Sequence, residues 1–205
     1  MKKLLLSLFF VIFGTMASAQ VQDYPALFNV TDVPPGDILN VRAGPGVNHQ
    51  IIGTLARNAT GVEVIGTTED RRWGRVSMGE MSGWSSMRYL TRTGPSWDQG
   101  LPAPLYCSGT EPFWSYDRQV GGGSWSDFEV QNQPHAERWS GSASGRGPSM
   151  FALDLDSGTA TMTAFIRRGI CSDGMSDRDY GIVAQFLRRS GGQTVLLDGC
   201  CSLAR

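Results

Sequence analysis

Lysine is nearly absent from this sequence of 205 residues, and arginine supplies almost all of its basic charge. The two lysines, Lys2 and Lys3, lie in an N-terminal segment that we expect to be removed. The remaining chain then carries 16 arginines against 19 acidic residues, which is a net charge of −3. The charges of both signs are interspersed, so the sequence shows no basic surface of the kind that attracts nucleic acids or anionic membranes. We expect neither as a partner.

Histidine, the commonest general base of enzymes, is also scarce. The two histidines, His49 and His135, stand in no motif with a nucleophile or a second metal ligand, and we expect both to be solvated loop residues. The glycine-rich stretches 121–124 and 140–145 lack the lysine of a phosphate-binding loop and the spacing of a nucleophile elbow. We therefore predict a non-enzymatic protein that needs no metal and no cofactor.

The first residues have the pattern of an export signal. Lys2 and Lys3 precede the apolar run 4–13, and small residues at 17–19 form a cleavage site after Ala19. The apolar run is too short for a stable membrane-spanning helix. We predict that residues 1–19 are a cleavable signal peptide, and that the mature protein is periplasmic without a membrane span.

Four cysteines, all in the second half, agree with an oxidising compartment. Cys107, Cys171, Cys200 and Cys201 form no CxxC pair and no zinc-type spacing, so we predict two disulfides. A bridge between Cys200 and Cys201 would close no loop. Adjacent strand residues point to opposite faces, so these two should reach different partners. We favour Cys171–Cys200 with Cys107–Cys201, and the swapped pairing stays open.

Composition and patterning both predict an all-β protein. The chain has 26 glycines and 10 prolines, which favour short strands joined by tight turns. Several short candidate strands crowd residues 24–92, and their density indicates a small, strongly bent barrel. These candidate strands are residues 38–42, 51–55, 62–65, 73–76 and 83–84.

The first half resembles the bacterial SH3 (SH3b) domain. The resemblance covers residues 24–92 and rests on LNVRAGPG at 39–46, IGTL at 52–55, WGRV at 73–76, GW at 83–84 and YL at 89–90. Residues 78–81 depart from the polar hairpin usual in the family. Relatives bind cell-wall peptides in grooves between loops, which implies a ligand site here.

The candidate residues of this site are Arg42, Asn48, Trp73 and Trp84. An arginine fork suits the carboxylate of a stem peptide. Trp73 and Trp84 have the character of recognition aromatics, although packing inside the barrel is an equally open role for both.

Residues 93–104 contain three prolines and read as a linker that leaves the two halves free to move, with Trp97 packed on one neighbour. Residues 105–205 then predict a disulfide-braced antiparallel β-barrel or sandwich. Tight hairpins are expected at 156–159 and 190–192, and the polar stretch 131–149 is expected to be a mobile excursion.

The second half resembles a family of small, functionally uncharacterised envelope proteins. The motifs are CSGTEPFW at 107–114, CSDGMSDR at 171–178 and GCC at 199–201, while a proline expected after Tyr180 is missing. The resemblance implies an envelope location and a compact β-fold, and no reaction.

A possible second site consists of Glu111, Trp114, Asp173 and Asp177. The aspartates could cap a turn, contact a ligand or a metal, or act as a catalytic acid. Glu111 could instead accept local hydrogen bonds, and Trp114 could be a core aromatic.

Together these features predict a monomeric periplasmic binding protein whose partner is peptidoglycan, bound by its peptides, or an envelope protein. The alternatives are a proteinaceous inhibitor of a wall hydrolase such as lysozyme and, third, a periplasmic hydrolase.

Overall fold

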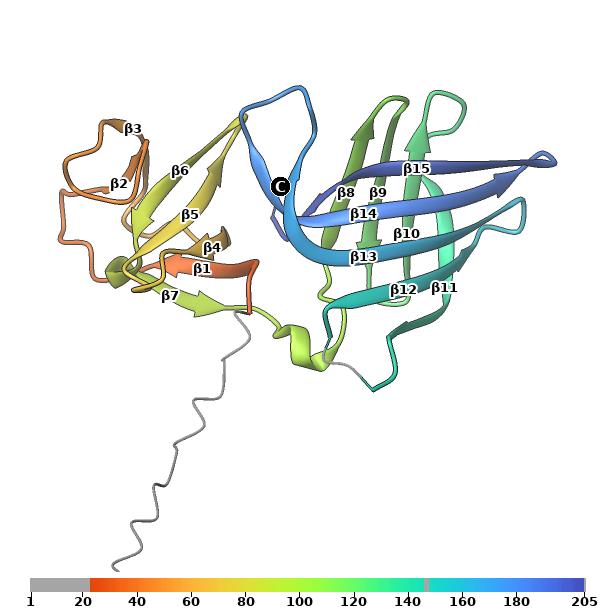
Figure 1. Cartoon of the computed structure of the whole chain (residues 1–205), viewed down its shortest axis with the longest axis horizontal. Coiled ribbons are helices and arrows are strands. Elements are labelled where there is room, and N and C mark those ends of the chain that lie inside the picture. The colour runs from red at the N-terminus through yellow and green to blue at the C-terminus, as the bar shows by residue number, and fades with distance from the viewer. Residues whose placement is uncertain (1–22, 146–147, 205) are drawn as a thin grey trace, which may run out of the picture.

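The computed structural model describes residues 23–145 and 148–204, so the predicted signal peptide, 1–19, lies outside the described residues. The described chain is all-β, as predicted, and forms two modules (Figure 1). The first module is a seven-stranded sheet and the second is a closed eight-stranded barrel, which decides between the barrel and the sandwich expected from the sequence. The strands of the first module end at Thr93, and those of the second begin at Leu105.

The first module is a strongly bent antiparallel sheet with the strand order β3-β2-β6-β5-β4-β1-β7. Its inward side chains include Val41, Val64 and Val76, which are fully buried. The first strand, absent from the sequence prediction, adds Phe28 and Val30 to the same core. The strands are β1 (Ala26–Val30), β2 (Leu39–Arg42), β3 (Ile51–Leu55), β4 (Val62–Thr67), β5 (Trp73–Met78), β6 (Met81–Ser86) and β7 (Leu90–Thr93), and a 3-10 turn, η1 (Met87–Tyr89), precedes the last.

The second module is an up-and-down barrel in which each strand pairs with the next along the chain. β15 pairs with β8 and closes it. The two hairpins expected from the sequence join β12 to β13 and β14 to β15. The strands are β8 (Leu105–Thr110), β9 (Phe113–Gln119), β10 (Gly122–Asp127), β11 (Gln133–Ser142), β12 (Met150–Asp156), β13 (Ala160–Ser172), β14 (Asp179–Ser190) and β15 (Gln193–Ser202).

The stretch 131–149 was expected to be a mobile loop, and this expectation was wrong for most of its length. Residues 133–142 form β11, which pairs with β10 and β12 and has a bulge between Glu137 and Trp139. Its apolar alternation is missing because its inward-facing residues include His135, which is buried, and Glu137, which is partly buried. Glu137 is paired inside the barrel with Arg118, at 2.8 Å between Oε2 and Nη2.

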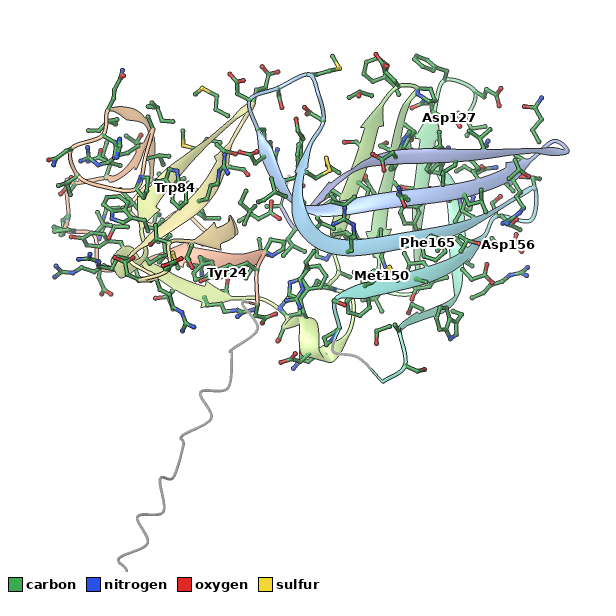
Figure 2. All side chains as sticks on the ribbon, in the orientation of Figure 1. Tyr24, Trp84, Asp127, Met150, Asp156 and Phe165 are labelled. Atoms are coloured by element: carbon green, nitrogen blue, oxygen red, sulfur yellow. A yellow bond between two sulfur atoms is a disulfide. The ribbon has the colours of Figure 1, made fainter. Side chains whose placement is uncertain are left out.

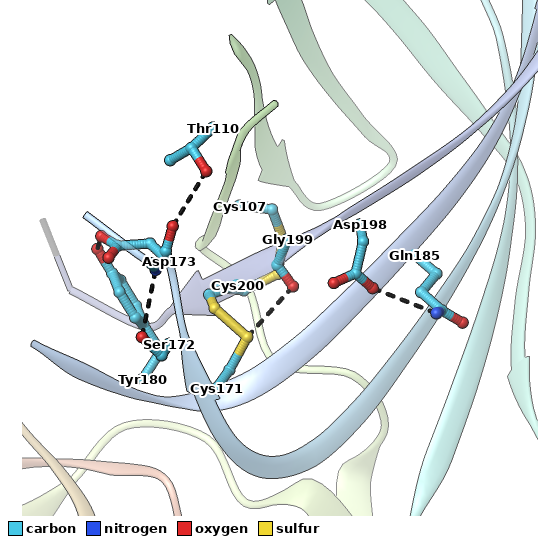
Figure 3. Close-up of a disulfide and its surroundings, with 12 residues drawn as sticks. Cys107, Thr110, Cys171, Ser172, Asp173, Tyr180, Gln185, Asp198, Gly199 and Cys200 are labelled. Atoms are coloured by element: carbon cyan, nitrogen blue, oxygen red, sulfur yellow. Dashed lines mark hydrogen bonds between the residues drawn. A yellow bond between two sulfur atoms is a disulfide. The ribbon is translucent and has the colours of Figure 1, made fainter. Parts of the chain in front are cut away.

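The two disulfides are Cys107–Cys201 and Cys171–Cys200, which is the pairing that the sequence favoured. Cys107 and Cys201 are directly opposite each other in the β8–β15 pair that closes the barrel. Cys171 and Cys200 connect the outer part of β13 to β15 (Figure 3). Both bridges therefore brace the second module at the strand pair that closes the barrel and beside it.

Trp97 joins the two modules through the linker. It lies in the 3-10 turn η2 (Trp97–Gln99), is 1 % exposed, and packs against Phe151 with ring centres 5.9 Å apart. Its indole Nε1 donates a hydrogen bond of 2.7 Å to the carbonyl of Pro25 in the first module. The linker is thus anchored by a buried aromatic, which differs from the free relative motion that its composition suggested.

The β13–β14 hairpin makes a second contact between the modules. Its strands extend past the barrel and reach the β5–β6 hairpin of the first module (Figure 1). The Asp179 amide donates to Ser82 Oγ at 2.8 Å, and the Asp179 carboxylate is ion-paired with Arg75. An isolated β-bridge joins Met81 to Asp177. The modules therefore share backbone, side-chain and ionic contacts.

A buried glutamate lies at the same junction. Glu63 in β4 is 4 % exposed, and its Oε1 accepts a 2.8 Å hydrogen bond from the Leu203 amide of the second module. Arg178 Nη2 is 3.9 Å from Oε2. Burial raises the pKa of Glu63 to about 7, against the opposing effects of the Leu203 hydrogen bond and the Arg178 charge.

This raised pKa predicts that Glu63 contributes more to the stability of the folded protein at acidic than at alkaline pH. The pKa of the Glu63 carboxyl is ordinary in the unfolded chain and raised in the folded protein. Its favourable contribution to the free energy of unfolding is therefore present below about pH 4.5 and is lost as the pH rises to about 7. Relative to Glu63→Gln, the wild type should gain about 2 to 3 kcal/mol between about pH 8 and about pH 5. Urea unfolding of both proteins at the two pH values measures this, and parallel pH profiles would contradict it.

Candidate functional site

A row of side chains crosses the open face of the first module. Arg42 on β2 is directly opposite Trp84 on β6, and Trp84 is directly opposite Arg75 on β5. The guanidinium carbon of Arg75 is 6.0 Å from the centre of the Trp84 ring. We call these three residues the Arg-Trp-Arg row; Trp84 is labelled in Figure 2.

The alternation of β5 explains why this row faces outward. Gly74 and Val76 are buried, so Trp73 and Arg75 lie on the opposite, partly exposed side of the strand. On β6, Gly83 is buried, and a Cβ there would be 2.5 Å from Val41 Cγ1. Only glycine lets these strands approach so closely, and this close packing leaves the neighbouring tryptophan on the outer face.

The loop that follows β2 is tied to the row. Arg42 Nη1 donates a 2.8 Å hydrogen bond to the carbonyl of His49, which fixes one end of loop 43–50 beside the row. Asn48 is exposed in this loop, and Ile51, directly opposite Arg42 on β3, is 47 % exposed. The row is therefore bordered both by the loop 43–50 and by the apolar side chain of Ile51.

The structure places the four predicted residues of this site as follows. Arg42 and Trp84 are cross-strand neighbours, Trp73 is on the same side of β5 as Arg75, and Asn48 is in the adjoining loop. Sequence reasoning missed Arg75, although its position two residues after Trp73 in a strand marks it as sharing that face.

Arg42 and Arg75 differ in whether their guanidinium groups are free to bind a carboxylate ligand. Arg75 is ion-paired with Asp179, whereas Arg42 has no acidic partner among the described residues. One of the five N–H donors of Arg42 is used by His49, and a planar carboxylate fits the remaining fork. The adjacent Trp84 ring offers an apolar surface. The row can thus bind a group that combines a carboxylate with a small apolar side chain.

The candidate residues of the second module face in different directions. Trp114 is 4 % exposed and belongs to the barrel core, while Glu111 is exposed in the turn between β8 and β9. Asp177 is bridged to Met81 of the first module. Thr110 donates a 3.0 Å hydrogen bond to the Asp173 carbonyl, so the Asp173 turn lies beside the Glu111 turn (Figure 3).

Asp173 caps the turn in which it lies. Its Oδ1 accepts hydrogen bonds from the amides of Met175 and Ser176, at 3.0 and 2.9 Å, and its Oδ2 accepts one from the Tyr180 hydroxyl at 3.2 Å. Burial acts to raise the pKa of Asp173, but these hydrogen bonds outweigh it and hold the pKa below its usual value. Such a carboxylate is suited to holding the hairpin tip and is a poor general acid.

The two histidines have opposite environments. His49 is exposed in its loop, whereas His135 is 2 % exposed inside the barrel, so the expectation of a solvated His135 was wrong. Burial lowers the pKa of His135 and outweighs the opposing effect of the Gln133 carbonyl, which is 3.1 Å from its Nδ1. Among residues 23–145 and 148–204, no group of three or more His, Cys, Asp and Glu side chains is placed to hold a metal ion. No helix in the same ranges has the length and apolar character to cross a membrane.

Comparisons with known proteins bear on the first module. No curated protein and no solved structure gives a significant match to the chain. The resemblance of the second half to an envelope family gains no support from these comparisons, and its barrel fold stands on the structure. Residues 37–91, which contain the whole Arg-Trp-Arg row, match the family model described as the bacterial SH3 domain, and the first module is similar to that family.

Proposed function

We propose that this protein is an exported, non-enzymatic periplasmic protein that binds the cell wall through its first module. The Arg-Trp-Arg row is the binding surface, and the peptide stems of peptidoglycan are the ligand. The similarity of residues 37–91 to bacterial SH3 domains supports association with the wall, and the signal-like segment 1–19 supports export.

The observation that carries this proposal is that Trp84 is the cross-strand neighbour of Arg42, whose guanidinium has no acidic partner among the described residues. Stem peptides carry carboxylates together with small apolar side chains, so one stem presents both groups that the row accommodates. Asn48 in the adjoining loop adds an amide that can bind the peptide backbone.

A titration with a soluble stem tetrapeptide, L-Ala-γ-D-Glu-diaminopimelate-D-Ala, tests this site on the full mature chain. We expect the indole NMR signal of Trp84 to shift on binding. Arg42→Gln should weaken binding about tenfold or more, because a hydrogen bond between charged groups contributes about 1.5 to 3 kcal/mol.

Arg57→Gln is the matched control, since Arg57 is exposed in the turn after β3 and the substitution changes the net charge equally. Equal weakening by both variants would show a general charge effect and would contradict the assigned site. A lysozyme assay on a soluble substrate separates the alternative function, because an inhibitor slows the enzyme and a wall-binding protein does not.

A further inference from the structure

The second module has an open cavity at one end of its barrel that the proposed function does not use. The cavity has a volume of about 440 Å³ and is formed by side chains from β9, β10, β14 and β15 and the loop after β10. Asp127, labelled in Figure 2, lies at this end of the barrel. Sites for small molecules in proteins typically have volumes of about 300 to 1,000 Å³.

The floor of the cavity consists of two stacked tryptophans. The rings of Trp114 and Trp125 are 5.2 Å apart at 8° to each other, and the two residues are 4 % and 0 % exposed. Phe186 packs against both, with ring centres 5.0 and 5.8 Å away. The floor is therefore flat, apolar and held rigidly by the barrel core.

The rim consists of two phenylalanines that water reaches. Phe113 is 50 % exposed and Phe128 is 78 % exposed, and their rings meet edge to face with centres 6.0 Å apart. They come from the start of β9 and from the loop between β10 and β11. Two large rings held together in solvent above an aromatic floor are typical of a surface that a ligand covers.

One polar group in the cavity has hydrogen-bonding capacity that the protein does not use. The Arg188 side chain is 14 % exposed, and its guanidinium carbon is 5.7 Å from the centre of the Trp125 ring. Its Nε is buried and has no hydrogen-bond partner among the described residues. A buried donor without a partner costs about 1 to 3 kcal/mol, which a ligand acceptor would recover.

The charge of Arg188 is balanced by Asp127, whose Oδ2 is 3.7 Å from Nη2. Asp127 is itself occupied: it accepts hydrogen bonds from Trp125 Nε1 at 2.8 Å and from the amides of Glu129 and Val130 at 2.8 and 2.9 Å. The Arg188–Asp127 pair therefore offers a hydrogen-bond donor to the cavity, and the pair as a whole carries no net charge. The other ionisable lining residue, Glu129, is exposed, so the buried part of the cavity carries no uncompensated charge for a charged ligand.

We infer that the barrel mouth is a binding site for a small uncharged molecule that has a flat apolar ring system and one acceptor oxygen. The ring system lies against Trp114 and between Phe113 and Phe128, and the oxygen accepts the hydrogen bond from Arg188 Nε. This site is independent of the Arg-Trp-Arg row and of wall binding.

The neutral fluorophore prodan, a naphthalene with a ketone oxygen, is a probe of this chemistry. With the full mature chain we expect saturable binding at one site, a blue shift of its emission, and energy transfer from tryptophan. The analogue 2-dimethylaminonaphthalene lacks the ketone and should bind about tenfold more weakly, since a hydrogen bond from a charged donor contributes about 1.5 to 3 kcal/mol.

Three variants locate the probe. Phe128→Ala should weaken prodan binding about fivefold, for a loss of about 1 kcal/mol of apolar contact, and it should fold normally because Phe128 is largely exposed. Val195→Trp places a bulky ring in the cavity wall, where Val195 is 45 % exposed, and should abolish binding. Phe165→Ala is the control, because Phe165 is 40 % exposed but does not line the cavity.

Absence of saturable prodan binding would overturn the inference, and so would binding that survives both Phe128→Ala and Val195→Trp. Equal affinity for prodan and its ketone-free analogue would overturn the role of Arg188. Each variant is compared with the wild type by circular dichroism, so that loss of binding is assigned only to folded protein.

Discussion

Replacing Cys107 and Cys201 with alanine should lower the free energy of unfolding by about 4.7 kcal/mol. The bridge closes a loop with a sequence separation of 94, and the chain-entropy estimate for a loop of that length is about this size. It also joins the strand pair that closes the barrel. Urea unfolding of the double variant under oxidising conditions measures the loss.

Cys171→Ala with Cys200→Ala is the matched control. Its bridge has a sequence separation of 29, for which the same estimate gives about 3.6 kcal/mol. The first double variant should therefore be less stable than the second by about 1 kcal/mol. If removal of the shorter loop costs as much or more, loop closure does not explain the stabilisation.

Arg118→Met should cost about 3 to 5 kcal/mol, because it leaves Glu137 as an unpaired charge inside the barrel. The two side chains are 7 % and 10 % exposed, and Arg118 Nε donates to Glu137 at 2.9 Å. Arg118 Nη1 also donates to the carbonyls of Leu101 and Pro102, which ties the linker to the barrel. Thermal unfolding monitored by circular dichroism measures the loss.

Adding Glu137→Leu to Arg118→Met should recover most of this stability, since replacing both members of a buried ion pair with apolar groups is often close to neutral. A double variant as unstable as Arg118→Met would show that the linker contacts matter and that the buried charge does not.

The fold could be predicted where local signals are strong. Turn residues at 156–159 and 190–192 located two hairpins, and the motif at 39–46 located the first module. β11 was missed because its inward-facing residues include His135 and Glu137, and Glu137 is paired with Arg118 of another strand. A barrel strand with polar inward-facing residues lacks the alternation of apolar and polar residues by which a strand is predicted from sequence.

The candidate sites show the same limit. Arg42 and Trp84 stand in a recognisable motif, but their contact with each other and with Arg75 depends on the register of β2, β6 and β5. At the barrel mouth, Trp114 was a candidate from its motif, whereas Arg188 comes from a strand far along the chain. No local spacing in the sequence connects such residues.

Co-sedimentation with purified peptidoglycan sacculi tests the central claim, that the first module binds the wall through its stem peptides. The full mature chain should pellet with intact sacculi, and Arg42→Gln should remain largely in the supernatant. Neither protein should pellet with sacculi whose stem peptides an amidase has removed. Equal retention of the wild type and Arg42→Gln, or retention on stripped sacculi, would contradict the claim.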